Sequence, residues 1–276
     1  MALSDHDFEH LRDFIYTICG MYFHATKKYF LENRLARRME ETGTKAYEDY
    51  FPLLKSSRGS SGELTSLLNE ITTNETYFFR NASQCTALEN KLLPEIVDIK
   101  NKMGFRKLRI WSAASSSGEE AYTLAMILLE KQATVLKDWD IEIIGTDINE
   151  KVIAQANAGI YNAYSVRNIP EMYRRKYIRE DNGTFILSPV VKKLVTFNKL
   201  NLYEDAKMVF MKSFDFIFCA NVLIYFDSAS KSKVVQHFYN NLQPYGYFFV
   251  GQSESLHGVN DKFKTVHFPG CFGYKK

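Results

Sequence analysis

Apolar residues in the first hundred positions recur every three or four residues, which is the spacing of amphipathic helices. Ser4 and Asp7 form a capping-box pattern that predicts the start of the first helix. Gly43 is predicted to end the second helix, because glycine favours the position just after a helix. The further predicted helices lie at about 26–41, 45–55 and 63–71, with a flexible turn at 56–62.

The pattern changes near Arg106, where short apolar runs begin to alternate with helical segments. This alternation is typical of an α/β domain, a parallel sheet with helices on its faces. A polar stretch at 170–189, with a turn at Asn182-Gly183, interrupts the alternation and predicts an insertion, and a hairpin is predicted around Pro269-Gly270. The predicted strands are 107–111, 141–146, 194–197, 214–219 and 247–251, and the predicted helices are 119–131, 150–158 and 230–242.

Length and charge narrow the class of protein. A chain of 276 residues, with 46% hydrophobic and 24% charged residues, can form one large domain or two unequal ones. Lys and Arg exceed Asp and Glu by 35 − 32 = 3, too few to predict binding to nucleic acid or to a membrane surface. The first residues lack a signal-peptide pattern, and no apolar run approaches the roughly 20 residues that cross a bilayer. We therefore expect a cytoplasmic protein.

Cysteine and serine patterns exclude two kinds of chemistry. The four cysteines form no CxxC pair, and Cys219 lies in an apolar run that predicts a buried free thiol. No metal site is assigned to the cysteines or to the six histidines. The run Ser115–Ser117 lacks the GxSxG elbow of serine hydrolases.

Candidate binding residues gather where the predicted strands end, because ligands bind at the carboxyl ends of strands in an open parallel sheet. A loop of small residues at 112–118 allows close approach to a ligand, and Glu119 follows it at a helix start. Asp147 ends the second strand, where a carboxylate can accept both hydroxyls of a ribose. Asn221 and Tyr225 follow a later strand. Together these positions predict a site for a nucleoside cofactor.

The same residues have other interpretations. The separation of Gly118 and Asp147 is 147 − 118 = 29 residues, and the loop lacks GxGxxG, which argues against a nicotinamide enzyme. Asp147 alternatively caps the next helix, and Glu119 is alternatively a charge at a helix start. Asn221 alternatively bonds its own backbone, and Tyr225 alternatively belongs to the core.

Several segments, in the same order over nearly the whole chain, resemble the chemotaxis receptor methyltransferases, the CheR family. Each segment alone is a weak signal, but the ordered set is specific. The segments are Thr72–Arg80 (TTNETYFFR), Trp111–Glu120 (WSAASSSGEE), Gly145–Asp147 (GTD), Ala158–Tyr161 (AGIY), Asn201-Leu202 (NL), Phe214–Asp227 (FDFIFCANVLIYFD) and Gly251–Glu254 (GQSE).

The resemblance implies a fold and a cofactor. It implies an all-helical N-terminal domain (1–80), a linker helix (81–105) and a Rossmann-like methyltransferase domain (106–276) with a small antiparallel β insertion at about 170–197. It also implies that S-adenosyl-L-methionine binds between the two domains and leaves as S-adenosyl-L-homocysteine. The cofactor-binding residues that it implies are Asn74, Thr76, Arg80, Glu119, Asp147, Asn201, Leu202, Ala220 and Asn221.

The resemblance further implies methylation of glutamate side chains in chemoreceptors. Arg80 and Tyr225 are the catalytic candidates near the transferred methyl group. A glutamate is already ionised near pH 7, so the reaction needs no general base. The alternatives are a cofactor-binding regulatory module without catalysis and a methyltransferase of another signalling protein.

Arginines on the second predicted helix supply a candidate partner surface. Arg34, Arg37 and Arg38 stand at i, i+3 and i+4 and therefore share one face. They resemble the family's receptor-facing arginines, which predicts contact with the cytoplasmic helical region of chemoreceptors. Ala220 stands where the family often has arginine, and the insertion is shorter than in members that grip a receptor's C-terminal tail. We predict a monomer that is independent of such a tail peptide, with no nucleic-acid partner and no insertion into membranes.

Overall fold

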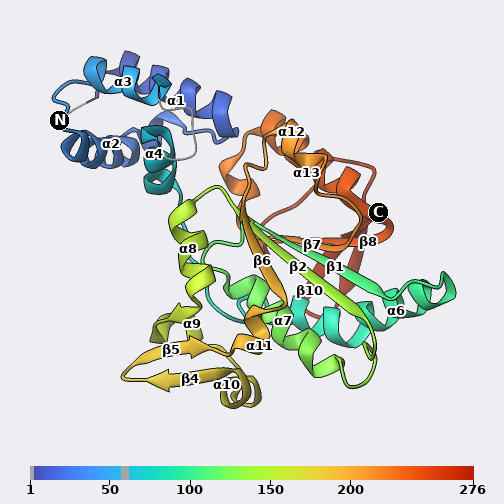
Figure 1. Cartoon of the computed structure of the whole chain (residues 1–276). Helices are drawn as coiled ribbons and strands as arrows, with labels where there is room; N and C mark the ends of the chain where they lie inside the picture. Colours follow the sequence, from blue (N-terminus) through green and yellow to red (C-terminus); the bar gives the residue numbers. More distant parts are fainter. Residues whose placement is uncertain (1–2, 57–61) are drawn as a thin grey trace.

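The helical N-terminal domain, blue to teal in Figure 1, has its helices close to the predicted positions, although the helix predicted at 26–41 begins with a separate 3₁₀ helix at Ala25–Lys27. A computed structural model describes residues 3–56 and 62–276, so most of the turn predicted at 56–62 lies outside the described residues. Ser4 Oγ accepts the Asp7 N–H at 3.1 Å, and Gly43, with φ of 72°, ends the second helix in the left-handed conformation. The helices are α1 (Asp5–Cys19), η1 (Ala25–Lys27), α2 (Lys28–Thr42), α3 (Tyr47–Ser56) and α4 (Glu63–Ile71).

A separate hydrophobic core holds this domain together. Leu11, Ile15, Leu31, Tyr50 and Leu67 are almost fully buried, one or two from each of the four α-helices. The linker then runs along the sheet as α5 (Ala82–Ala87), η2 (Leu88–Leu92) and α6 (Leu93–Lys102).

The second domain contains the predicted parallel sheet, which confirms the α/β fold. Its seven strands follow the order β6-β2-β1-β7-β8-β10-β9, in which the first five are parallel and β10 is antiparallel to both of its neighbours. The predicted C-terminal hairpin is confirmed as β9 and β10 at the sheet edge. The strands are β1 (Lys107–Ala113), β2 (Asp140–Asp147), β6 (Val195–Lys199), β7 (Phe214–Cys219), β8 (Leu242–Val250), β9 (Lys264–Phe268) and β10 (Cys271–Lys275).

Hydrophobic side chains cover both faces of the sheet, as expected when helices pack on each side. Neighbouring residues of β1 alternate between two cores: Ile110 belongs to one and Trp111 to the other. Helix α7 packs on the first face and α13 on the second (Figure 1). The helices of this domain are α7 (Glu119–Lys131), α8 (Glu150–Ala158), α12 (Asp205–Met208), η3 (Leu223–Tyr225) and α13 (Ser228–Asn241).

A small antiparallel sheet forms the insertion, with its strands in the order β3-β5-β4. Asn182 and Gly183 have positive φ angles and make the predicted turn between β4 and β5. The insertion predicted at about 170–197 misses β3 and extends into β6, which belongs to the main sheet. Its elements are β3 (Ile160–Tyr161), α9 (Ala163–Val166), α10 (Glu171–Tyr177), β4 (Ile178–Asp181), β5 (Thr184–Leu187) and α11 (Pro189–Lys192).

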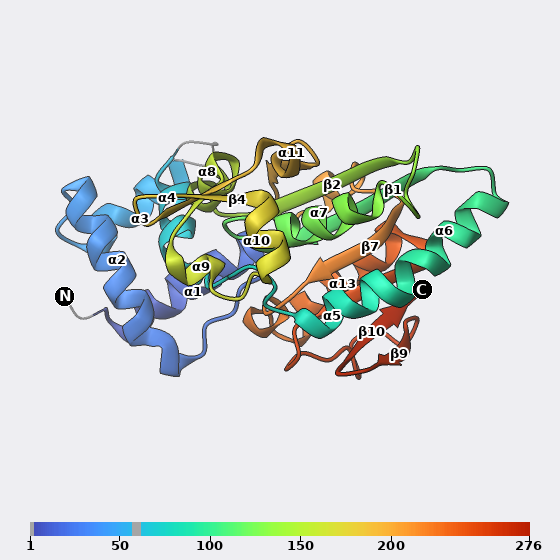
Figure 2. The ribbon, with the colours of Figure 1, turned by 90° about the horizontal axis from the view of Figure 1, so that it is seen from below.

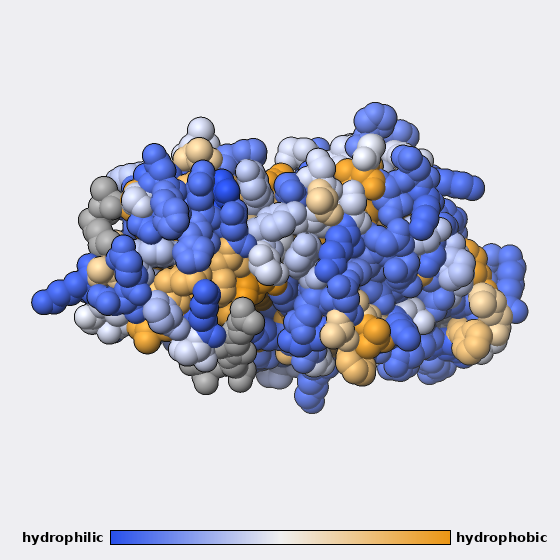
Figure 3. Space-filling model, turned by 90° about the horizontal axis from the view of Figure 1, so that it is seen from above, coloured by the Kyte–Doolittle hydropathy of each residue, from blue (hydrophilic) through white to orange (hydrophobic). Residues whose placement is uncertain are grey.

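Seen from below, the linker helices run along the sheet, beside the C-terminal hairpin and away from the N-terminal domain (Figure 2). Figure 3 shows a face that is largely hydrophilic, with hydrophobic residues gathered in separate areas. In the described part of the chain, every helix is too short or too polar to span a bilayer. Over the same residues, no three His, Cys, Asp or Glu side chains gather as a metal site, and Cys219 is a buried free thiol.

Candidate functional site

A cavity of about 330 Å³ opens between the N-terminal domain, the linker and the carboxyl ends of the parallel strands. We call it the interdomain cavity. Its wall combines segments that are far apart in the sequence, as predicted for an open sheet. The segments that line it include 72–77, Arg80, 114–116, Glu120, 147–148, 200–202, 220–222 and 224–226.

The loop after β1 supplies one wall of the cavity. Ala114 and Ser116 have positive φ angles, so the loop is tightly turned before α7 begins. Gly118, with φ of 92°, also lacks room for a side chain, because a Cβ atom there would lie 2.8 Å from the Phe197 ring. Ser115 Oγ is buried and has no hydrogen-bond partner among the described residues.

Asp147 lies at the end of β2 and lines the cavity. Its Oδ2 accepts the Ser116 N–H at 2.8 Å, and its Oδ1 accepts the Asn149 N–H at 2.9 Å. Burial raises the pKa of Asp147, while these backbone N–H groups act in the opposite direction. The N-cap of α8 is Asn149, so the alternative in which Asp147 caps that helix is wrong.

The two glutamates at the start of α7 have different environments, and this corrects one prediction. Glu119 is buried away from the cavity, where it accepts hydrogen bonds from Ser117 Oγ at 2.7 Å and Ser165 Oγ at 2.9 Å. Glu120, which the sequence prediction omitted, lines the cavity and accepts from Ser112 Oγ at 2.7 Å. Desolvation by burial raises the pKa of Glu120 to about 7, although the Ser112 hydrogen bond and the Arg80 charge oppose the rise. Glu120 therefore replaces Glu119 as the carboxyl that can meet a cationic ligand.

The segment after β6 joins the cavity to the N-terminal domain. Asn201 and Leu202 line the cavity, as predicted. Asn201 Nδ2 donates to the Ile18 carbonyl at 2.7 Å, so its amide is already bonded to the end of α1. The Leu202 carbonyl accepts from His237 Nδ1 at 2.9 Å, so α13 fixes the position of this segment from outside.

The loop after β7 carries Ala220, Asn221 and Tyr225, which all line the cavity. Asn221 has a φ angle of 59° and is held in this conformation by Glu254, whose Oε2 accepts the Asn221 N–H at 2.7 Å. The same Oε2 accepts the Gly251 N–H at 2.7 Å. Glu254, in the GQSE segment, therefore organises this loop, a role that the sequence pattern alone did not predict. The signal was a carboxylate in an otherwise apolar and small-residue environment.

The segment 72–80, between α4 and α5, supplies the remaining predicted residues. Asn74, Thr76 and Arg80 line the cavity opposite the sheet. The Arg80 guanidinium donates to the Glu75 carbonyl and lies 5.5 Å from the Tyr77 ring centre. These contacts orient the Arg80 side chain near Glu120, whose pKa its charge lowers.

The three arginines of α2 do not form one exposed face, and this corrects the partner-surface prediction. Arg37 is exposed and Arg34 is half-buried beside the Phe30 ring. Arg38 is buried and forms an ion pair with Glu63 at 2.7 Å, so it is engaged inside the domain. The side chain therefore stabilises the domain instead of presenting a charge to a partner.

The fold and the site define a Rossmann-like domain that binds a nucleoside cofactor at its strand ends, under a helical domain that completes the cavity. The chain belongs to the CheR methyltransferase family. Residues 74–271 match the family's S-adenosylmethionine-binding domain, and residues 6–72 match its all-alpha domain. The protein is thus a methyltransferase whose cofactor is S-adenosyl-L-methionine, and the nicotinamide alternative is excluded.

Relatives of similar length support the same assignment. Chemotaxis protein methyltransferase 2 of Vibrio cholerae is 38% identical over 100% of this chain and 94% of that protein. The chemotaxis protein methyltransferase of Borreliella burgdorferi is 36% identical, over 88% of this chain and 86% of its own length. Chemotaxis protein methyltransferase 1 of Pseudomonas aeruginosa is 33% identical, with 96% of each chain covered.

Proposed function

We propose that this chain is a protein-glutamate O-methyltransferase that forms glutamate methyl esters in chemoreceptors. The observation that carries the proposal is the interdomain cavity, which combines the cofactor-binding segments of the sheet with Arg80 and Tyr225. The names of the relatives associate these proteins with chemotaxis, which supports a chemoreceptor as the substrate.

The chemistry of the cavity suits transfer to a carboxylate. The cofactor supplies an electrophilic methyl group on a cationic sulfonium. A glutamate with a reference pKa of about 4.3 is ionised near pH 7, so the protein need not remove a proton. Its task is to align the three reacting atoms and exclude water, and good alignment can contribute roughly 7–11 kcal/mol.

The cofactor-binding residues that we propose are those that line the cavity. Glu119 is excluded because it is buried away from the cavity, and Glu120 takes its place. Asp147 has its carboxylate at the cavity wall, where it can accept ribose hydroxyls. The full proposed set is Asn74, Thr76, Arg80, Glu120, Asp147, Asn201, Leu202, Ala220 and Asn221.

A direct assay tests the proposed reaction. The purified chain is incubated with radiolabelled S-adenosylmethionine and the cytoplasmic fragment of a chemoreceptor, and the product is treated with mild alkali. A glutamate methyl ester releases volatile labelled methanol, whereas N-methylated products retain their label. Binding of S-adenosylhomocysteine without any transfer to receptors would instead favour the regulatory module, and transfer to another signalling protein alone would favour the third alternative.

Arg80→Ala is expected to lower kcat/KM by roughly a hundredfold, because a positioned cation near the reacting groups is lost. Measuring S-adenosylhomocysteine affinity by calorimetry distinguishes the two roles of this residue. A loss of affinity as large as the loss of kcat/KM indicates contact with the cofactor's carboxylate, and unchanged affinity indicates contact with the substrate glutamate. Full activity with unchanged affinity would exclude both roles.

Glu120 predicts a pH dependence of cofactor binding. Because its pKa is about 7 in the free protein, Glu120 holds a proton below that pH. A cationic ligand stabilises the carboxylate and lowers this pKa, so binding releases the proton. Affinity for S-adenosylhomocysteine, which carries an ammonium group, should therefore rise from pH 5.5 to about 7 and then level off. In calorimetry Glu120→Gln should bind more weakly and lose this rise; an unchanged rise would exclude Glu120 as the titrating group.

The partner surface that we propose on α2 comprises Arg34 and Arg37, without Arg38. Both are accessible to solvent at least in part, and cations there suit the acidic helical region of a chemoreceptor. We further propose that the protein acts as a cytoplasmic monomer.

Independence of a receptor tail peptide also remains our proposal. Strand β4 is an edge strand of the small sheet, and its charged residues Arg179, Glu180 and Asp181 are exposed. Charged side chains disfavour the addition of a further strand at such an edge. Calorimetry with a receptor-tail pentapeptide should give no measurable binding; micromolar binding would contradict the proposal.

A further inference from the structure

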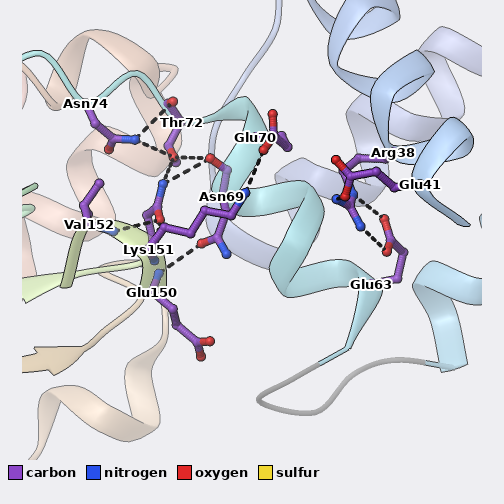
Figure 4. A network of polar contacts seen from close by, with 11 residues as sticks. Arg38, Glu41, Glu63, Asn69, Glu70, Thr72, Asn74, Glu150, Lys151 and Val152 are labelled. Carbon is purple, nitrogen blue, oxygen red and sulfur yellow. Dashed lines mark hydrogen bonds and ion pairs between the residues drawn. The ribbon is translucent and has the colours of Figure 1, made fainter. Parts of the chain in front are cut away.

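The end of α4 and the start of α8 meet beside the interdomain cavity through polar contacts, part of which Figure 4 shows. Asn69 Oδ1 accepts the Glu150 N–H at 3.0 Å, and Lys151 Nζ pairs with Glu70 Oε1 at 2.9 Å. The last turn of a helix in one domain is thereby bonded to the first turn of a helix in the other. Both helices lead directly into cavity-lining segments, because Thr72 follows α4 and Ile148 precedes the cap of α8.

Asn149 is the most heavily bonded side chain in this contact. Its Oδ1 accepts the Lys151 N–H at 2.9 Å, and its Nδ2 donates to Thr72 Oγ1 at 2.8 Å and to the Asn69 carbonyl at 3.1 Å. Its backbone N–H donates to Asp147 at 2.9 Å. Asn149 is 1% exposed and does not line the cavity, so it cannot contact a ligand there.

These contacts close into a ring of hydrogen bonds around one corner of the cavity wall. The Asn149 backbone N–H donates to Asp147 Oδ1, and Asp147 Oδ2 accepts the Ser116 N–H. Ser116 Oγ then donates to the Asn74 carbonyl at 3.1 Å, and Asn74 Nδ2 donates to Thr72 Oγ1 at 3.3 Å. Asn149 Nδ2 bonds the same Thr72 oxygen and completes the ring. The other four members all line the cavity.

We propose that Asn149 is a positioning residue that fixes the cofactor-binding wall by tying the N-terminal domain to Asp147. The inference rests on the proposed function in one respect, namely that Asp147 and the linker contact the cofactor from opposite sides. Asn149 acts through these two neighbours. Without its amide, the segment after α4 loses its direct side-chain bond to the residues that follow β2. The bond through Ser116 and the contacts of Asn69 and Glu70 with α8 remain, so the cavity is less well preorganised for its ligand.

Asn149→Ser isolates this role. Serine is as good an N-cap as asparagine, so α8 keeps its cap, but the shorter side chain cannot donate to Thr72 or Asn69. We expect S-adenosylhomocysteine to bind about tenfold more weakly in calorimetry, as for the loss of two buried hydrogen bonds. In the methylation assay KM for the cofactor should rise to a similar extent, while kcat at saturating cofactor should stay close to that of the unmodified protein.

Asn162→Ser is the matched control. Asn162 also caps a helix, accepting the Ser165 N–H at 3.0 Å, but it is exposed and lies in the small-sheet insertion. Its replacement should leave cofactor affinity unchanged. Asn149→Ser should unfold a few degrees lower than Asn162→Ser, because it loses two buried hydrogen bonds. Affinities are therefore compared at 25 °C, where circular dichroism must show both variants fully folded, which separates a positioning role from a loss of folded protein.

Thr72→Val tests the ring as a unit. Valine has nearly the same shape as threonine but cannot accept the two amide hydrogen bonds. If the ring acts as one element, the Asn149→Ser, Thr72→Val double variant should bind no more weakly than the weaker single variant. Independent effects that multiply would overturn the ring, and unchanged affinity of Asn149→Ser would overturn the positioning role. If the unmodified protein did not bind S-adenosylhomocysteine, the proposed cofactor site itself would be wrong, and not only the role of Asn149.

Discussion

Asp147→Ala is expected to weaken S-adenosylhomocysteine binding by about a hundredfold or more. In the proposed site, the substitution removes the acceptor of two hydrogen bonds from ribose hydroxyls, and bonds to charged groups contribute roughly 1.5–3 kcal/mol each. The substitution also leaves the Ser116 and Asn149 N–H groups without their acceptor, so the loop after β1 loses its support. Calorimetry of the wild-type and variant proteins, at equal folded fractions checked by circular dichroism, measures the effect.

Asp147→Asn removes the charge of the carboxylate but keeps part of the support of the loop. An amide has one oxygen, so it can satisfy only one of the two backbone N–H groups that Asp147 accepts. We expect its affinity to fall nearly as far as that of the alanine variant. Binding within threefold of the wild-type protein in both variants would exclude Asp147 from the cofactor site, because neither variant retains two ribose acceptors.

Sequence patterns predicted the helices and strands well, because the interactions that start and end these elements involve residues close together in the sequence. Ser4 caps α1 through a residue three positions away, and Gly43 ends α2 through its own backbone. The placement of Asp147 at the cavity also followed from sequence, since a residue that ends a parallel strand lies at the ligand-binding edge. The two-residue strand β3 was missed because so short a strand has no detectable alternation.

Two predictions at the site were wrong because the position of the side chain depends on a contact between distant residues or on the rotational orientation of a helix. Glu119 and Glu120 are adjacent, and successive helix residues point about 100° apart, so the orientation of α7 determines which carboxyl enters the cavity. Gly118, in the left-handed conformation, is the N-cap of this helix, and the apolar residues of α7 pack in the core. Arg38 was misassigned because its partner, Glu63, lies 25 residues away on another helix. Spacing on α2 alone could not distinguish an exposed arginine from a paired one.

Breaking the Arg38–Glu63 pair is expected to have the largest effect on stability. Both side chains are about nine-tenths buried, and Glu63 also accepts a hydrogen bond from the Tyr50 hydroxyl at 2.6 Å. Arg38→Ala leaves the Glu63 charge buried without its partner, which costs about 3–5 kcal/mol of unfolding free energy. Arg37→Ala, one position earlier on the exposed surface, should change the same quantity by less than about 0.5 kcal/mol. Urea unfolding followed by circular dichroism compares the two variants.

A charge-free pair distinguishes lost stability from lost partner contact. The double variant Arg38→Met, Glu63→Gln removes both charges and keeps an acceptor for Tyr50, so much of the unfolding free energy should return. If Arg38 acts only within the domain, receptor methylation should return with it, whereas Arg37→Glu should slow methylation in a fully folded protein. A double variant that is stable and binds the cofactor but does not methylate receptors would restore Arg38 to the partner surface. That result would contradict the burial of Arg38, because a side chain enclosed by its own domain cannot contact the receptor directly.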